Sequence, residues 1–535
     1  MNSLTTHTHF ENDRVYQARE DVVFSLKDTT SFDDAKYAAA MESSGRSVHM
    51  DVAIYLKDKK NITLDFQGHR LFLKGRMQPF LFDHCENIVV KNVVVEHDRA
   101  FCTEFLVLES TPEVLRGRLN PLTPCFDEDG KLVPYGPSWE NHELNRAPIF
   151  LQSFDATTYR GDGLWLIVLG NHPDMDMRLP WCSCTAQLIA KVNGDEVSFT
   201  GPKLPLLRVG TIGAIGHENR KYSSLQAVDC HSLTIQNYQI KNGAGMGLLL
   251  FHCQDVTIQG LVMAHDEKTK MATTNVADGI HAVSCSGDFV LSNSIIEGTM
   301  DDILNIHTNF YAFEEGKGKT IRVCCPGAVA KQYTIFNPGD KFVLHRGTTL
   351  EEKGTFTIEK MLRLGPQEWE FVIDTPCENG EKGDLLENLT CQPHVQITNC
   401  RFANANTHLR FQSRGGIEIE HCVTELPFWL TGDTNYWYEG SPVETMKLHD
   451  VRFETGFANI AVIPEFTPTL LKPYYHGKIE VTQCVFETDT PLQARQTASI
   501  CFQENQNSLA KPMRMVIRDC GEIKAEGIFV EKEGQ

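Results

Sequence analysis

The stretch Asp229-Cys230-His231-Ser232-Leu233-Thr234-Ile235 recurs 23 residues later as His252-Cys253-Gln254-Asp255-Val256-Thr257-Ile258. Each copy joins a cysteine-containing turn to a short strand in which polar and apolar residues alternate. The pattern returns upstream at His84–Val90 and, with one residue added, downstream at Ser284–Leu291. A unit this short cannot bury its apolar face alone, so neighbouring units must stack and share a core. The repeat predicts a right-handed parallel β-helix with coils of 22–23 residues.

Two long interruptions divide this repeat. Residues 102–207 contain scattered prolines and the hairpin signal Asn193-Gly194-Asp195, which predicts an inserted antiparallel β domain. Residues 311–388 hold short strands between Gly- and Pro-rich turns, as in a small barrel. The predicted order is an N-terminal cap and first coils (1–101), the first insertion (102–207), coils carrying the site (208–310), the barrel-like second insertion (311–388) and C-terminal coils (389–535). The fold class is therefore all-β, a parallel β-helix with two inserted antiparallel β domains.

Three carboxylates fall in two consecutive coils. Asp278 lies in Ala277-Asp278-Gly279-Ile280-His281, whereas Asp301 and Asp302 lie in Met300-Asp301-Asp302-Ile303-Leu304-Asn305-Ile306-His307. The step from Asp278 to Asp301 is 23 residues, about one repeat. Residues one coil apart in a solenoid lie about one strand spacing, roughly 4.8 Å, from each other. We therefore expect the three side chains to meet on one face.

Clustered carboxylates on an open face suit the cleavage of a glycosidic bond. One carboxylic acid protonates the leaving oxygen, while another carboxylate activates water or attacks the anomeric carbon. Like charges packed together raise the pKa of at least one group, which helps to keep an acid protonated near neutral pH. An isolated Asp-Gly is usually a turn, but a second aspartate pair one coil later, followed by apolar Ile303 and Leu304, favours an active site.

The motifs around Asp278 and Asp301-Asp302 resemble the signature of glycoside hydrolase family 110. The resemblance implies an exo-acting, inverting α-galactosidase for terminal α-1,3-linked galactose, built on a β-helix with two inserted β domains. It also implies that Asp278, Asp301 and Asp302 are the catalytic carboxylates. By analogy with family 28 polygalacturonases, Asp301 would be the general acid, and Asp278 and Asp302 would hold the water. The chain lacks the Gly-His-Gly and Arg-Ile-Lys elements of family 28, and Ile306-His307-Thr308 departs from the His-Gly pair expected in family 110.

Several further side chains are candidates for binding the sugar. They are His281, Asn305, His307, His408, Arg410, Trp429 and Trp437. The polar ones can bond to hydroxyl groups, and the segments Phe428-Trp429 and Tyr436-Trp437-Tyr438 could stack on a sugar ring. Histidines beside strands are as often structural, and aromatic segments as often belong to a core.

No cofactor and no metal site are expected from the motifs. The sequence has no Gly-rich phosphate loop, nucleophile elbow or His-Glu-x-x-His element. Its cysteines include Cys324-Cys325 and Cys182-Ser183-Cys184 but no C-x₂-C pair of the kind that binds zinc. The cysteines that recur in the repeat are expected to be buried free thiols.

Composition limits the partners. A formal net charge of −20 argues against nucleic acid and against an anionic membrane, and no apolar run is long enough to cross a bilayer. Residues 1–10 lack the basic and apolar regions of a signal peptide, so a cytoplasmic protein is expected. The expected partner is an α-galactosyl oligosaccharide or glycan, and a homo-oligomer stays open.

Three other functions stay open. They are a polygalacturonase-like hydrolase, a β-helix polysaccharide lyase and a non-catalytic carbohydrate-binding solenoid. A lyase would need a Lys or Arg base and usually Ca²⁺ for an acidic polymer, and the acidic balance of the chain counts against it. A binding solenoid would not need three converging carboxylates.

Overall fold

The computed structural model of the chain describes residues 2–32, 49–139, 149–170, 185–217, 221–266, 268–326, 336–365, 367–435, 437–454, 459–465, 477–487, 500–502, 514–521, 523, 525–526 and 529–532. Within these ranges all regular structure is strand, apart from one 3₁₀ helix, η1 (Leu26–Asp28). No helix in the described ranges is long and apolar enough to span a membrane.

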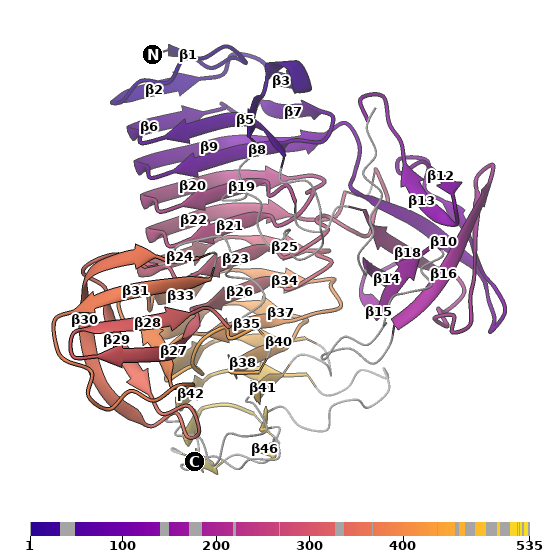
Figure 1. Ribbon diagram of the computed structural model, residues 1–535. Helices are drawn as coiled ribbons and strands as arrows, with labels where there is room; N and C mark the ends of the chain where they lie inside the picture. Colours follow the sequence, from indigo (N-terminus) through magenta and orange to yellow (C-terminus); the bar gives the residue numbers. More distant parts are fainter. Residues whose placement is uncertain are drawn as a thin grey trace.

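Most strands form a β-helix whose coils stack from one terminus to the other (Figure 1). One wall is a twelve-stranded sheet of β4 (Thr30–Phe32), β5 (Met50–Lys57), β8 (Gln78–Asp83), β19 (Leu225–Val228), β21 (Leu248–Phe251), β23 (Ile280–Val283), β26 (Leu304–His307), β35 (Leu409–Gln412), β38 (Phe428–Asp433), β41 (Ile460–Glu465), β44 (Ile500–Phe502) and β46 (Ala525–Glu526). Its strands pair in parallel, except β4 with β5.

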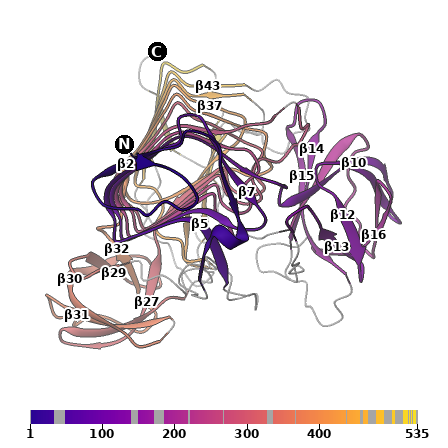
Figure 2. The ribbon, with the colours of Figure 1, turned by 90° about the horizontal axis from the view of Figure 1, so that it is seen from above.

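The remaining coil strands form a twenty-stranded sheet. It comprises β1 (Asn2–Ser3), β2 (Arg14–Gln17), β3 (Val22–Ser25), β6 (Lys60–Asp65), β7 (Arg70–Lys74), β9 (Glu86–His97), β20 (His231–Ile240), β22 (Gln254–Met263), β24 (Ser286–Ser292), β25 (Ile295–Glu297), β33 (His394–Thr398), β34 (Arg401–Ala403), β36 (Ile417–Glu420), β37 (Val423–Thr424), β39 (Thr445–His449), β40 (Arg452–Phe453), β42 (Lys478–Thr482), β43 (Val485–Phe486), β45 (Arg514–Arg518) and β47 (Phe529–Lys532). Seen along the stack, the coils superpose and a barrel projects from each of two sides (Figure 2).

The repeated motif forms the turn between the two sheets. Asp229 and His252, which precede the cysteines, both have a φ of 51°, a left-handed conformation in which Asp, Asn and His are enriched. The strands that follow are in register, with Leu233 opposite Val256. One repeat is therefore one coil, and the predicted parallel β-helix is confirmed. The cysteines at this position are buried free thiols, as the sequence predicts: Cys85, Cys230, Cys253, Cys285, Cys400 and Cys422. Cys182 and Cys184 lie outside the described residues.

The first insertion is a closed barrel. Its strands are β10 (Cys102–Ser110), β11 (Leu115–Leu119), β14 (Ile149–Asp155), β15 (Gly161–Leu169), β16 (Thr185–Asn193), β17 (Glu196–Thr200) and β18 (Thr211–Gly216), and the hairpin β12 (Cys125–Glu128) with β13 (Lys131–Pro134) lies outside the ring. Neighbouring strands are antiparallel except β15 and β16, which are parallel. The barrel extends past residue 207 because β18 closes it by pairing with both β10 and β14.

The second insertion is also a closed barrel, and its neighbouring strands are antiparallel. They are β27 (Phe310–Lys317), β28 (Thr320–Cys324), β29 (Lys341–His345), β30 (Glu352–Arg363), β31 (Glu368–Ile373) and β32 (Leu385–Asn388). Its core, which includes Phe336 and Trp369, is continuous with Leu249, Phe251 and Val283 of the β-helix. These three residues alternate with inward-facing core residues of β21 and β23, so the barrel packs against the outer face of the twelve-stranded sheet.

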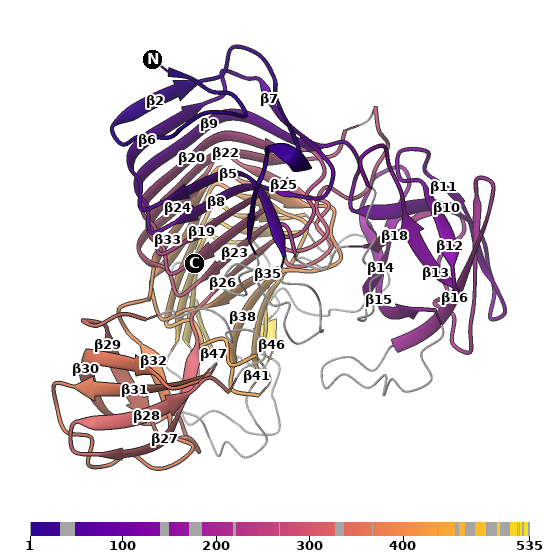
Figure 3. The same cartoon turned by 45° about the horizontal axis from the view of Figure 1, so that its top comes forward.

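That outer face changes character along the stack. In β21 the outward residues are apolar. In β23 they are His281 and apolar Val283, and in β26 they are Asn305 and His307. The residues between them, such as Ile280 and Leu304, belong to the β-helix core. Figure 3 shows this part of the wall, from β23 to β38, with the first barrel to one side and the second barrel to the other.

Candidate active site

The three aspartates lie where two neighbouring strands of the twelve-stranded sheet begin. Asp278 precedes β23 and Asp302 precedes β26, each by two residues, and Ile280 pairs with Leu304. Asp302 therefore stacks on Asp278, one coil of 24 residues away, and Asp301 lies one position earlier. The backbone confirms this stacking, because Gly279 N–H donates to the Asp302 carbonyl at 2.8 Å. The side chains of Asp278 and Asp302 are buried and Asp301 is half-buried.

Asp302 is the carboxyl of the cluster that resists ionisation. Burial raises its pKa well above the usual value, and the charges of Asp301 and Asp278 raise it further, against a smaller opposing effect of Arg410. Asp302 Oδ1 lies 3.1 Å from His408 Nε2. Burial, with Arg410, lowers the pKa of His408 well below its usual value. Burial and the neighbouring carboxylates thus favour the protonated form of Asp302.

Asp278 is held by a chain of histidines. His281 Nδ1 lies 2.5 Å from Asp278 Oδ2, and His281 Nε2 lies 3.0 Å from His307 Nε2. His307 Nδ1 donates to the Thr308 carbonyl at 2.7 Å, and burial lowers the pKa of His307 to about 4. His307 is therefore neutral and accepts at Nε2, so His281 must donate there. The contact of His281 Nδ1 with Asp278 thus holds the Asp278 side chain in a fixed orientation.

Most of the predicted sugar-binding residues form one row across the wall. His281, Asn305, Arg410 and Trp429 stand opposite one another in β23, β26, β35 and β38. The ring of Trp429 stacks on His408 with centroids 3.6 Å apart. Within the described residues, Asn305 Oδ1 and Trp429 Nε1 are buried and make no hydrogen bond, so each can bond to a bound hydroxyl group.

Glu439 also belongs to this site, although nothing in the sequence pointed to it. Its carboxylate lies 3.8 Å from His307 and 3.9 Å from Arg410, and it accepts a hydrogen bond from Gln412 Nε2 at 2.9 Å. Burial alone would raise the pKa of Glu439, but the neighbouring His307, Arg410 and His281 hold it at about 2. A fourth, ionised carboxylate therefore faces the same row.

Trp437 lies in the loop that leads to Glu439. Asp433, at the end of β38, accepts the backbone N–H groups of Asn435, Trp437 and Tyr438 at 2.6, 2.7 and 3.1 Å. These bonds shape the loop, and Trp437 follows the end of β38 rather than standing in the row of paired strand residues. Tyr436 lies outside the described residues.

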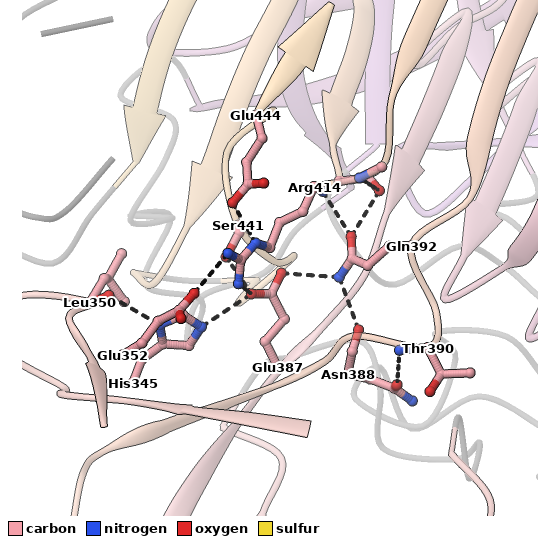
Figure 4. Close-up of polar contacts among 12 residues, drawn as sticks. His345, Leu350, Glu352, Glu387, Asn388, Thr390, Gln392, Arg414, Ser441 and Glu444 are labelled. Atoms are coloured by element: carbon pink, nitrogen blue, oxygen red, sulfur yellow. Dashed lines mark hydrogen bonds and ion pairs between the residues drawn. The ribbon is translucent and has the colours of Figure 1, made fainter. Parts of the chain in front are cut away.

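The second barrel supports this loop through a buried polar network (Figure 4). Glu387 of β32 accepts hydrogen bonds from Ser441 Oγ at 2.8 Å, from Gln392 Nε2 at 3.1 Å and from His345 Nε2 at 3.2 Å. Arg414 completes the network, with Nη1 3.5 Å from Glu387. Because Ser441 is two residues from Glu439, the barrel helps to fix the carboxylate in the site.

The first barrel braces the other side of the cluster. Gln152 Nε2 of β14 donates to the Met300 carbonyl, and Asn406 Nδ2 donates to Gln152 Oε1 at 3.0 Å. The carbonyl of Asp301 accepts bonds from Thr299 Oγ1 at 2.8 Å and from Thr407 Oγ1 at 2.7 Å. The backbone that carries Asp301 is thus fixed independently of its side chain.

This β-helix wall carries a carboxyl with a raised pKa, an ionised carboxylate and a row of polar and aromatic side chains. Such an arrangement is suited to general acid–base chemistry on a sugar. No family model matches the chain. It is 25% identical over 506 residues to α-1,3-galactosidase B of Bacteroides thetaiotaomicron, covering 90% of this chain and 78% of the relative. It is 22% identical over 477 residues to α-1,3-galactosidase A of Bacteroides fragilis, covering 85% and 75%. These relatives confirm the resemblance to glycoside hydrolase family 110.

Among solved structures, the chain aligns with the tailspike protein gp49 of Pseudomonas phage LKA1 over 90% of this chain and 66% of that one, with 9% identity. The TM-score is 0.24, too low to relate the two molecules in detail.

Proposed function

We propose that this protein is an exo-acting, inverting glycoside hydrolase that removes terminal α-1,3-linked galactose from oligosaccharides or glycans. The removal of α-linked galactose is supported by the relatives, which are named α-1,3-galactosidases and align with 85–90% of the chain. The observation that carries the proposal is the stacking of Asp278 and Asp302 on adjacent coils, with Asp301 beside them, at the end of the sugar-binding row.

We assign the acid role to Asp301, the most exposed of the three carboxyl groups. It would protonate the glycosidic oxygen as the bond to the anomeric carbon breaks. The raised pKa of Asp302 makes that group unsuitable as a base, so Asp278 is the better candidate. Asp278 would take a proton from the attacking water, and the water oxygen would bond to the anomeric carbon from the opposite face. His281 keeps Asp278 in place for this transfer.

Exo action is supported by the depth of the cluster. Asp278 is 2% exposed and Asp302 is 6% exposed, so an internal sugar with glycan continuing on both sides would have little access. The terminal galactose would lie along the row of Asn305, Arg410 and Trp429, with the leaving glycan directed towards the more exposed Asp301.

A set of aryl α- and β-galactosides together with α-1,3-galactobiose tests this function. We expect hydrolysis of the α-linked substrates only, and β-galactose as the first product in NMR spectra recorded before mutarotation. α-Galactose as the first product would rule out inversion. Activity on polygalacturonate, or an unsaturated product, would indicate a polygalacturonase-like hydrolase or a lyase instead.

A further inference from the structure

Three residues far apart in the sequence meet where the second barrel joins the β-helix. His252 follows β21 in the wall, Asp340 precedes β29 in the barrel, and Cys391 follows β32 as the chain returns to the coils. One ligand atom from each lies within 4.8 Å of the other two. Within the described part of the chain, no other group of three His, Cys, Asp or Glu side chains comes this close together.

The histidine is oriented as metal-binding histidines are. His252 Nδ1 lies 2.7 Å from Asp229 Oδ1, so Nδ1 donates to this carboxylate and Nε2 is directed to the other side of the ring. There, Nε2 lies 3.9 Å from Asp340 Oδ2. A carboxylate behind a histidine fixes its tautomer and raises its basicity as a ligand. Asp229 and His252 occupy equivalent positions in adjacent coils, so the β-helix itself builds this pair.

The carboxylate and the thiol are also held in place. Asp340 Oδ2 accepts hydrogen bonds from the Asn337 N–H at 2.9 Å and from Asn388 Nδ2 at 2.7 Å. Cys391 is 1% exposed, and its backbone N–H donates to Asn388 Oδ1 at 3.3 Å. The His252 and Asp340 side chains are 15% and 10% exposed, so an ion and a water molecule can reach the cluster from solvent.

The donor set identifies the class of ion. One thiol, one imidazole and one carboxylate suit Zn²⁺, with bonds of roughly 2.3, 2.0 and 2.1 Å. Ligand atoms around a tetrahedral zinc are about 3.3–3.6 Å apart, so the 3.9 Å between Nε2 and Oδ2 needs a contraction of only a few tenths of an ångström. Hard cations such as Mg²⁺ and Ca²⁺ prefer oxygen ligands and would not use Cys391.

We propose that His252, Asp340 and Cys391 form a zinc site that joins the second barrel to the β-helix. On binding, the Cys391 thiol and the Nε2–H of His252 each lose a proton to solvent. His252 then binds through Nε2, Asp340 binds through one carboxylate oxygen, and a water molecule completes the tetrahedron. The ion would link one residue of the β-helix to two residues at the ends of the barrel, beside the apolar contact that holds the two together.

Metal analysis of the full-length protein tests the site. The chain, purified without a histidine tag, is loaded with Zn²⁺, freed of unbound ion by gel filtration and analysed by mass spectrometry. We expect about one zinc per chain, and little in His252→Gln or Cys391→Ser. Asp229→Asn should weaken binding by about 10–100-fold, because it removes the partner that orients the histidine.

Two control variants separate this site from adventitious binding. His84 occupies the equivalent turn position in a neighbouring coil and lies 3.7 Å from the other oxygen of Asp229, but it is half-exposed. His84→Gln should retain full zinc, as should Cys377→Ser in the same barrel. In addition, Co²⁺-loaded wild-type protein should show a sulfur-to-cobalt charge-transfer band that is absent from Cys391→Ser. Wild-type protein without zinc after loading, or zinc retained by folded Cys391→Ser, would overturn the proposal in favour of a His252 ion pair with Asp229 and Asp340.

Discussion

Replacing Asp301 by Asn tests the assignment of the general acid. Asparagine has nearly the same size but cannot donate an acidic proton to the glycosidic oxygen. The fold should tolerate the change, because the Asp301 carbonyl is held by Thr299 and Thr407, and the Asn oxygen can still accept the Asp302 N–H that Asp301 Oδ1 accepts at 3.1 Å. Because Asp301 is half-exposed, its replacement by Asn should change the free energy of unfolding by no more than about 0.5 kcal/mol.

The expected loss of activity depends on the leaving group. General acid catalysis contributes about 10²–10⁴-fold, or roughly 3–5 kcal/mol of barrier, so kcat on α-1,3-galactobiose should fall by that factor in Asp301→Asn. Nitrophenolate leaves without protonation, so kcat on nitrophenyl α-galactoside should fall by less than about tenfold. The assay compares galactose release from the disaccharide with nitrophenol release from the aryl substrate.

Asp278→Asn is the matched control for this comparison. The base is needed whatever the leaving group, so the variant should lose activity on both substrates, and azide should restore turnover of the aryl galactoside by forming β-galactosyl azide. Equal losses on the two substrates in Asp301→Asn would refute its role as the acid. If Asp302→Asn showed the leaving-group pattern instead, the acid role would pass to Asp302.

Other predictions follow from the charged groups around Asp302 and from the proposed zinc site. Because the pKa of Asp302 is raised in the folded state, this residue contributes to the free energy of unfolding below about pH 4. That contribution is lost as the pH rises through the folded-state pKa. Asp302→Asn should therefore gain thermal stability over the wild type as pH increases, which melting curves from pH 4 to 9 can check; a constant difference would contradict the raised pKa. Arg410 lies 3.9 Å from buried Glu439, so Arg410→Met should raise KM because that carboxylate loses a partner. An unchanged KM on α-1,3-galactobiose would show that Arg410 does not contribute to binding. EDTA-treated protein should keep kcat at 25 °C but melt at a lower temperature, since no proposed zinc ligand is one of the three aspartates; loss of kcat with unchanged melting would place a metal in the chemistry.

The β-helix could be predicted because each repeat is recognisable from a short stretch of sequence. Each turn places a polar residue in the left-handed region before a buried cysteine, as at Asp229-Cys230 and His252-Cys253. The strand that follows alternates in and out, so a 23-residue step returns the same pattern one coil later. The same period predicted that the aspartates meet on one face, but it did not predict their register. The coil from Asp278 contains 24 residues, which aligns this residue with Asp302 and not with Asp301.

The residues that sequence reasoning missed are placed by contacts between distant segments. Glu439 follows an aromatic loop, and it becomes part of the site only because Asp433 folds that loop and Ser441 attaches it to the barrel. The cluster of His252, Asp340 and Cys391 was missed for the same reason. Metal-binding motifs are recognised by short spacings, whereas His252 and Asp340 are 88 residues apart and meet only when the barrel closes against the wall. Closure of an inserted domain leaves no periodic signal.

The inserted barrels explain how a solenoid can hold such a site. The outer face of a β-helix wall is a flat sheet open to water, and water favours the ionised form of each aspartate. Burial is the largest cause of the raised pKa of Asp302, so the segments around the site must be held against it. The first barrel holds the backbone at Met300, and the second fixes the segment of Glu439 through Ser441. The coils thus set the spacing of the carboxyl groups, and the insertions hold the surrounding segments in place.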